Sequence, residues 1–295
     1  MLQQIVLYGL TFISGLFFGS FYNLVSDRIP KGRGILTGRS KCDHCGKTLG
    51  AKSLLPLLSF AMQKGKCVYC GKRLSTYYPV SEVLTGLVFM GVAFLSGILS
   101  EINFATVLTF IYFAVIAGFY IILTLTDLKY RLIPNKIIYT AIIFVTFFLL
   151  LNAVLTILFT YNQLKNDEFG IYLLQAGYLE QQISAITKSF GLLLLSSLGI
   201  SAFFLLLIFI TKGKGMGGGD VKLAFLIGMV NGFPFNIAAI FLGFVIGAVF
   251  SIILVLFRKK SLKDTVPFGP FLILGSVIAF VWGEMIWYWY VTLLS

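Results

Sequence analysis

Long apolar stretches separated by short polar segments dominate the chain. Each stretch has about the 20 residues that a helix needs to cross the hydrocarbon core of a bilayer. The pattern therefore predicts an all-α polytopic membrane protein. Seven stretches stand out, near residues 5–26, 79–100, 103–126, 137–160, 187–211, 236–257 and 270–294.

The segment 221–257 is too long for one span and short for two. It is interrupted at 231–234 by the sequence Asn-Gly-Phe-Pro, which favours a turn. We expect a short helix at 221–232 before the span at 236–257, so the count becomes about eight transmembrane helices. The first apolar stretch has no basic residue before it and no small-residue cleavage pattern after it. We expect it to be a retained helix rather than a signal peptide.

The distribution of cations predicts the orientation of the chain, because lysine and arginine are retained on the cytoplasmic side during insertion. Of 23 such residues, 21 lie in the segments 27–78, 127–136, 211–222 and 257–264. One orientation, with both termini outside, places all four segments in the cytoplasm. We therefore expect a multi-pass protein of the bacterial cytoplasmic (inner) membrane.

The composition agrees with this assignment and limits the partners. The chain is 58% hydrophobic and only 12% charged, which is more apolar surface than a soluble core of this size can bury. Its net charge of +12 is explained by contact with anionic membrane lipid, so no nucleic acid is expected. The outer loop near 161–187 could lie on the membrane as an amphipathic helix, and we assign it no chemistry.

One sizeable soluble insert separates the first two predicted spans. The chain therefore divides into a first transmembrane helix at 1–26, a cytoplasmic insert at 27–78 and a helical membrane domain at 79–295. An insert of about fifty residues is too small for a sufficient hydrophobic core and usually needs a metal or disulfides.

All four cysteines lie in this insert, as Cys42 with Cys45 and Cys67 with Cys70. Two Cys-x-x-Cys pairs at this separation resemble a zinc ribbon. Two disulfides are the alternative, but the charge pattern places the insert in the reducing cytoplasm, where disulfides are rare. We expect a structural zinc, because four thiolates leave no open position for catalysis. The single histidine, His44, is expected at the surface, which excludes Ser–His or Cys–His catalysis elsewhere.

Three acidic residues lie beside predicted spans, where a charge is costly unless it has a function. Asp127 ends the third span, Asp220 follows a glycine-rich segment at the start of a later helix, and Glu82 lies near the start of the second span. The alternation of spans places Asp127 and Asp220 at the same cytoplasmic depth, although 93 positions separate them. The two aspartates can therefore meet there.

Two carboxylates held close together share one proton, because each charge disfavours the other. The ionised member can take a proton from a water molecule that attacks a peptide carbonyl, while the protonated member donates to the carbonyl oxygen. This aspartic-protease chemistry needs no metal and no histidine. Alternatively, each aspartate caps a helix end or pairs with Lys129, Arg131 or Lys222. The spacing alone leaves both interpretations open.

Several motifs, in order along the chain, resemble those of type IV prepilin peptidases, which are membrane aspartyl proteases of the GxGD class. Their joint occurrence in one order is highly specific. The matching segments are 19–25, 28–30, the two Cys-x-x-Cys pairs, 55–59, 78–86, Asp127 with 133–135, 217–223 and 267–271.

The resemblance implies cleavage of prepilins and pseudopilins on the cytoplasmic side, next to a glycine that precedes their hydrophobic N-terminal helix. It also implies methylation of the new amine from S-adenosylmethionine, because the insert with its cysteines intact resembles that of bifunctional members. Asp127 and Asp220 match the catalytic pair of the family. Asn23 and Glu82 are candidates to line the methyl-donor site, although both are equally compatible with a structural role.

Two other functions remain as alternatives. In a transporter or channel, Asp127, Asp220 and Glu82 would line a cation path, but such a site belongs near the middle of the membrane. A non-catalytic scaffold would use the metal-bound insert to bind partners. That interpretation leaves the glycine run before Asp220 without an explanation.

Overall fold

The structure, a computed structural model, describes residues 2–35, 38–42, 44–213, 216–257 and 266–294. Across these residues it is helical, and the only extended pairing is two isolated bridges in the insert. The backbone divides into two compact units, Met1–Pro134 and Asn135–Ser295. Most of the basic segment 257–264, which the sequence predicts to be cytoplasmic, lies outside the described residues.

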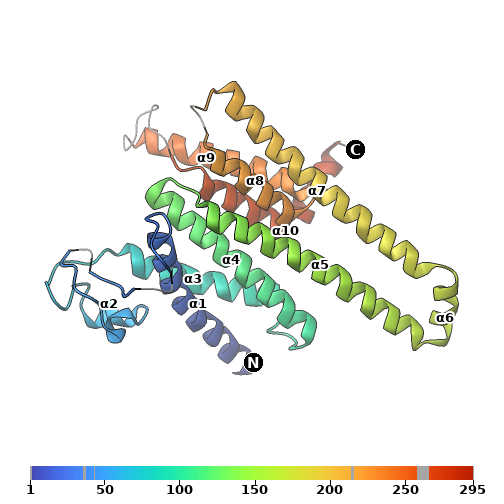
Figure 1. The fold of residues 1–295 in the computed structure, drawn as a ribbon, viewed down its shortest axis with the longest axis horizontal. Coiled ribbons are helices and arrows are strands. Elements are labelled where there is room, and N and C mark those ends of the chain that lie inside the picture. The colour runs from blue at the N-terminus through green and yellow to red at the C-terminus, as the bar shows by residue number, and fades with distance from the viewer. Residues whose placement is uncertain (1, 36–37, 43, 214–215, 258–265, 295) are drawn as a thin grey trace. The chain divides into compact units, whose positions relative to one another are not determined.

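Seven of the described helices are long and apolar enough to cross a membrane, which confirms the predicted all-α polytopic class. Each corresponds to one apolar stretch of the sequence. They are α1 (Leu2–Arg28), α3 (Tyr77–Leu95), α4 (Phe104–Tyr130), α5 (Asn135–Lys165), α7 (Tyr178–Ile210), α9 (Phe235–Leu256) and α10 (Gly269–Leu294) (Figure 1).

The first unit contains α1, α3 and α4, with the insert between α1 and α3. Helices α1 and α3 pack against each other through small residues. A Cβ atom at Gly15 would lie 2.7 Å from the Cα of Gly86, and one at Gly19 would lie 2.9 Å from the Cα of Glu82. Small residues four positions apart allow membrane helices to approach closely. The insert adds two short helices, η1 (Ala51–Leu54) and α2 (Leu58–Met62).

The second unit contains α5 to α10, and α8 (Gly218–Asn231) is the short helix that the sequence predicts at 221–232. Its 14 residues extend about 21 Å, less than the roughly 30 Å of a bilayer core. Leu223, Ala224, Leu226 and Ile227 are fully buried, because α5, α7, α9 and α10 all contact this helix. α8 is therefore a core element of its unit.

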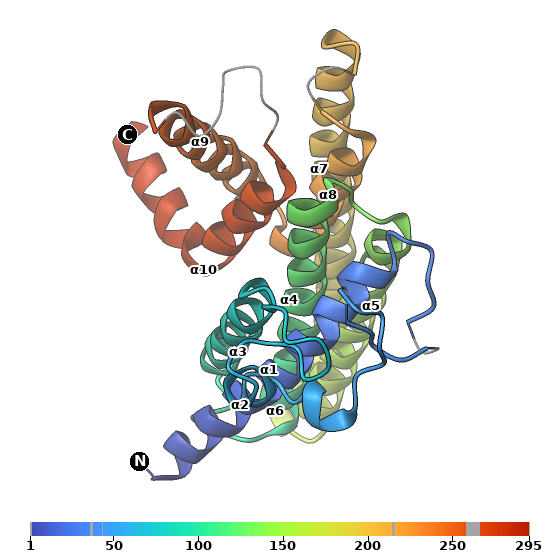
Figure 2. The same cartoon turned by 90° about the vertical axis from the view of Figure 1, so that its left-hand side faces the viewer.

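Helices α9 and α10 form the most extensive pair of the second unit and lie side by side (Figure 2). Glycines again permit the contact, because a Cβ atom at Gly275 would lie 2.3 Å from the carbonyl oxygen of Ala239. Such a distance excludes any side chain at this position unless the backbone moves.

The predicted outer loop at 161–187 is largely helical. α5 continues to Lys165 and α7 already begins at Tyr178, so both helices are longer than their predicted spans. Only α6 (Glu168–Gln175) forms a separate helix there, and Asp167 caps it by accepting a hydrogen bond from the amide of Gly170 at 3.0 Å. Figure 1 shows α6 at the turn between α5 and α7.

Candidate functional site

Asp127 lies in the last turn of α4, on the buried side of the helix. Its exposed fraction is 6%, and Thr126 beside it is fully buried. The helix ends at Tyr130 and is capped by Arg131, whose backbone adopts the left-handed conformation and donates a hydrogen bond to the backbone oxygen of Asp127 at 2.9 Å. The local sequence therefore places a buried carboxylate three residues before the end of a predicted membrane helix.

Asp220 lies in the first turn of α8 and is partly exposed. Its carboxylate accepts a hydrogen bond from the amide of Gly217 at 3.2 Å, which is the capping interaction that its position predicts. The positive end of the helix dipole favours the negative charge there. Lys222, a potential partner of Asp220 in the sequence, donates instead to the side chain of Asn135 at 2.7 Å and lies over the ring of Tyr139.

Asp127 belongs to the first unit and Asp220 to the second. Each lies at the end of a helix rather than in its middle. Their convergence on one substrate stays a prediction of the sequence.

Lys129, two residues after Asp127, lies in a network of side-chain contacts that the sequence did not predict. The Lys129 ammonium forms an ion pair with Asp27 and lies 5.4 to 5.7 Å from the ring centroids of Tyr77, Tyr78 and Tyr130. The hydroxyls of Tyr78 and Tyr130 each donate to the Asp27 carboxylate at 3.1 Å. Three aromatic faces and a carboxylate are favourable surroundings for a cation. This Asp27–Lys129 network joins the end of α1, the start of α3 and the end of α4.

The four cysteines are brought together as predicted. Their sulfur atoms all lie within 4.8 Å of one another, and no disulfide joins them. This grouping fits a tetrahedral metal site with four thiolate ligands. His44 is exposed and does not belong to the group, in agreement with its predicted surface position.

The two Cys-x-x-Cys segments fold into equivalent turns. The amide of Cys42 donates to the oxygen of Lys47, and the amide of Cys67 donates to the oxygen of Lys72 in the same way, at 3.0 and 2.9 Å. The glycine after each pair has a positive φ, 69° at Gly46 and 67° at its counterpart. Glycine adopts this conformation without the steric cost of a Cβ atom. The repeated Cys-x-x-Cys-Gly-Lys sequence thus encodes both halves of the site.

Backbone amides hydrogen-bond to Cys67 and Cys70 and act to lower the pKa of their thiols, which favours the thiolate form that binds a metal. The amides of Cys70 and Tyr69 lower the pKa of the Cys67 thiol to about 7. At Cys70 the amide of Lys72 acts to lower the pKa, but lost solvation and the neighbouring thiols raise it to about 11. Four negative charges at this separation repel one another, and a divalent ion would remove that repulsion.

The two residues that were candidates for the methyl-donor site are both buried in the first unit. Asn23 is 4% exposed and hydrogen-bonds to Ser81 at 2.8 Å, which ties α1 to α3. Glu82 is 8% exposed and accepts a hydrogen bond from the amide of Leu57, in the insert, at 3.0 Å. Asn23 thus has a structural contact between helices, whereas Glu82 connects a membrane helix to the insert.

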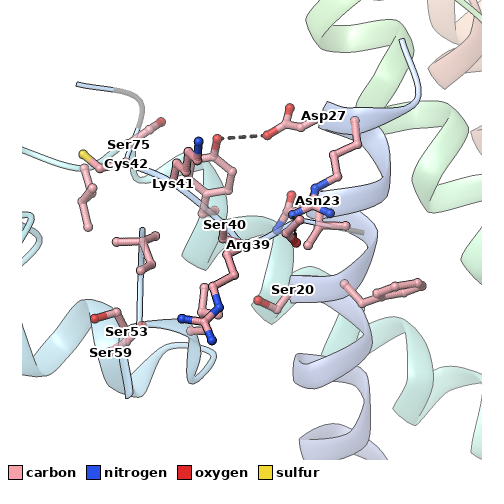
Figure 3. Close-up of a pocket in the computed structure, with 18 of the residues that line it drawn as sticks. Ser20, Asn23, Asp27, Arg39, Ser40, Lys41, Cys42, Ser53, Ser59 and Ser75 are labelled. Atoms are coloured by element: carbon pink, nitrogen blue, oxygen red, sulfur yellow. Dashed lines mark hydrogen bonds between the residues drawn. The ribbon is translucent and has the colours of Figure 1, made fainter. Parts of the chain in front are cut away.

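Asn23 and Glu82 line a cavity of about 850 Å³, named here the insert pocket. It lies between the last turns of α1, the first turns of α3 and the loops of the insert (Figure 3). Asp27 and Arg39 also line it, so the pocket carries charges of both signs.

Two family models match the sequence. The model of the bacterial peptidase A24 N-terminal domain matches residues 13–96, which include the four cysteines and Glu82. The model of the type IV leader peptidase family matches residues 169–252, which include Asp220. Asp127 lies between the two matched segments.

Curated relatives match almost the full length. The prepilin leader peptidase/N-methyltransferase of Bacillus subtilis (strain 168) is 33% identical over 280 residues, which cover 95% of this chain and 96% of the relative. The proteins of the same name from Aeromonas salmonicida (strain A449) and Pseudomonas aeruginosa are 29% and 26% identical, over 97% and 94% of this chain and 94% and 90% of their own lengths. No solved structure matched significantly.

Proposed function

This chain belongs to the family of prepilin leader peptidases/N-methyltransferases, and from that membership we propose its reaction and its site. The protein cleaves the leader peptides of type IV prepilins or pseudopilins and N-methylates the new N-terminal residue. The observation that carries the proposal is the match to the Bacillus subtilis relative along 95% of the chain. The buried carboxylate of Asp127 at the end of a predicted membrane helix supports it.

Asp127 and Asp220 carry the hydrolysis. In the reactive state one carboxyl is ionised and the other is protonated, because two adjacent negative charges repel each other. The ionised member takes a proton from water as the water oxygen attacks the scissile carbonyl. The protonated member donates to the carbonyl oxygen. When the tetrahedral intermediate collapses, the proton taken from water passes to the leaving amine, and the proton on the former carbonyl oxygen returns to its carboxyl, which restores the pair. Burial of Asp127 and the helix-end position of Asp220 suit these unequal roles.

The reaction occurs at the cytoplasmic surface of the bacterial inner membrane. The insert, the turn at 127–136 and the loop at 211–222 contain most of the cations, which favours a cytoplasmic position for all three. A prepilin presents its basic leader there and keeps its hydrophobic helix in the lipid. If the short helix α8 is counted as the eighth crossing, both termini of the chain lie outside.

Cys42, Cys45, Cys67 and Cys70 hold a structural zinc ion. Four sulfur atoms within 4.8 Å, with amides directed at Cys67, match the donor set that zinc prefers. The ion stabilises an insert that is otherwise built from two short helices and loops. S-adenosylmethionine supplies the methyl group.

A comparison of two variants with a matched control tests the proposal. Asp127→Asn and Asp220→Asn each remove one titratable carboxyl at constant size, so we expect cleavage of a purified prepilin to fall by about a thousandfold or more. Asp167→Asn is the control, because this aspartate also caps a helix but lies in the outer turn. Mass spectrometry of the prepilin N-terminus reads cleavage and methylation together. Unimpaired cleavage by either site variant would contradict the assignment.

A further inference from the structure

We propose that the insert pocket binds the methyl donor, a sulfonium of the S-adenosylmethionine class, and that Glu82 is the carboxylate facing its positive charge. This inference rests on the N-methyltransferase part of the proposed function. It assigns that activity to a site formed entirely by residues 20–82 of the first unit.

The size and the position of the pocket suit a small organic ligand. Its volume of about 850 Å³ lies within the range of roughly 300–1,000 Å³ that is typical of ligand sites. Phe21 and Leu24 of α1 form one wall, while Cys42 and Leu49 beside the metal centre belong to another. The pocket therefore joins a predicted membrane helix to the cysteine cluster.

Glu82 is a buried carboxylate without a cationic partner. It is 8% exposed, and its contacts are the amide of Leu57 at 3.0 Å and the side chain of Ser20. Within the described part of the chain, no lysine or arginine forms an ion pair with it. A buried, unpaired charge is costly. A positively charged ligand in the pocket would remove this cost.

The backbone that holds Glu82 is strained. Leu57 has φ 56° and ψ −48°, and the amide of Leu58 donates to the oxygen of Pro56, which closes a γ-turn around Leu57. This turn type is rare and strained, and such strain concentrates at functional sites. It directs the Leu57 amide at the Glu82 carboxylate and so fixes the orientation of that carboxylate.

Two of the three arginines that line the pocket have different roles. Arg28 donates to the backbone carbonyls of Gly34, Ile35 and Gly38 at 3.0 to 3.2 Å, so it stabilises the pocket wall. Arg39 forms no hydrogen bond or ion pair with any residue that the structure describes. Figure 3 shows its side chain directed toward Ser20 and Ser59. Its guanidinium is placed to bind the carboxylate of a donor.

Five basic side chains and two carboxylates line the pocket, so its ligand must carry negative charge. The buried Glu82 in the wall favours a zwitterion over a purely anionic ligand. A lipid phosphate would satisfy Arg39 but would be repelled by Glu82. A methyl-sulfonium amino acid carries a carboxylate for Arg39 and a sulfonium for Glu82. Both partners line one cavity.

The methyl transfer needs only the donor, the new N-terminal amine of the substrate and a water molecule that accepts a proton. The new N-terminal ammonium of the substrate first loses a proton to water. The nitrogen lone pair then forms a bond to the methyl carbon as the carbon–sulfur bond breaks, and the electrons of that bond remain on sulfur. The positive charge moves from sulfur to nitrogen, so one fixed carboxylate faces it before and after the transfer.

Binding of S-adenosylmethionine to the zinc-loaded full chain in detergent tests the proposal by calorimetry. Glu82→Gln keeps the side-chain volume and an acceptor for the Leu57 amide but removes the charge. We expect the Kd to rise about tenfold or more, because a hydrogen bond to a charged group is lost or weakened. Glu101→Gln is the matched control, since Glu101 is exposed and does not line the pocket. Equal affinity of Glu82→Gln and wild type would overturn the assignment.

A second pair of variants fills the pocket without changing its charge. Ser59→Trp places a large side chain at the wall, whereas Met62→Trp on the same short helix α2 lies at a position that is 80% exposed. We expect donor binding to be lost only in Ser59→Trp, with zinc content and elution volume unchanged in both. Binding of short-chain phosphatidylglycerol, with no binding of the donor, would identify a lipid site instead and refute the proposal.

Parallel assays of the wild-type protein separate the possible failures. A wild type that cleaves a prepilin but neither methylates it nor binds the donor contradicts the methyltransferase part of the proposed function, and the pocket assignment with it. A wild type that methylates normally, while Glu82→Gln and Ser59→Trp bind the donor normally, refutes the pocket alone.

Discussion

The Asp27–Lys129 network gives a sharp test of how the first unit is held together. Lys129→Met removes the ammonium but keeps a flexible apolar side chain of similar length. The change deletes the ion pair with Asp27 and the contacts with the rings of Tyr77, Tyr78 and Tyr130. These side chains come from α1, α3 and α4, so the loss weakens the contact of all three helices.

The expected loss of stability follows from the exposure of the pair. The side chains of Lys129 and Asp27 are 34% and 24% exposed, between a surface pair, which contributes about 0.2–1 kcal/mol, and a buried one. Cation–π contacts add about 0.5–1 kcal/mol at exposed sites. We expect Lys129→Met to lower the free energy of unfolding by about 1–2 kcal/mol. The melting temperature should fall on the order of 5 °C.

Thermal unfolding of the purified protein in detergent measures this effect, with Lys136→Met as the control because Lys136 is exposed. A double-mutant cycle with Asp27→Asn isolates the pairwise part, which we expect to be about 1 kcal/mol. High salt should reduce the difference, since a partly exposed pair is partly screened. Equal melting temperatures of Lys129→Met and Lys136→Met, or strict additivity in the cycle, would refute the reasoning.

Two further predictions concern the metal and the helix packing. Replacing Cys42 and Cys45 by Ser should release zinc, detectable by elemental analysis, and reduce methylation more than cleavage; equal loss of both activities would contradict that division. Gly275→Ala should destabilise the second unit by about 1–3 kcal/mol, because its Cβ would lie 2.3 Å from a backbone oxygen, whereas Gly191→Ala has open space and should be neutral in the same unfolding assay.

The helices and the cysteine cluster could be predicted because both depend on local sequence. Each apolar stretch is long enough to cross a bilayer, so composition alone indicates the seven long helices that the structure contains. The two Cys-x-x-Cys-Gly-Lys segments form equivalent turns, and their repetition already implied a site with four sulfur ligands. Helix ends were less predictable, and α5 and α7 extend well into the expected outer loop.

No local pattern in the sequence predicts the Asp27–Lys129 network. Asp27 lies 51 positions from Tyr78 and 102 from Lys129, and the sequence presents the tyrosines as ordinary aromatic residues at helix ends. Only the close crossing of α1 and α3 at Gly15 and Gly86, with α4 beside α1, places these groups within bonding distance. Packing geometry, rather than residue type, creates this set of contacts.

The sequence by itself determined the membrane class, the cysteine cluster and the identity of the two candidate aspartates, since these follow from hydrophobic length, motif spacing and the rarity of charges near membrane helices. The tertiary structure alone decided what surrounds Glu82. The amide of Leu57, 25 positions away, and Arg39, which pairs with no described residue, face the same cavity because the insert folds back over the ends of α1 and α3. Burial and the absence of a described counter-charge turn an ordinary helix glutamate into a candidate ligand for a cation.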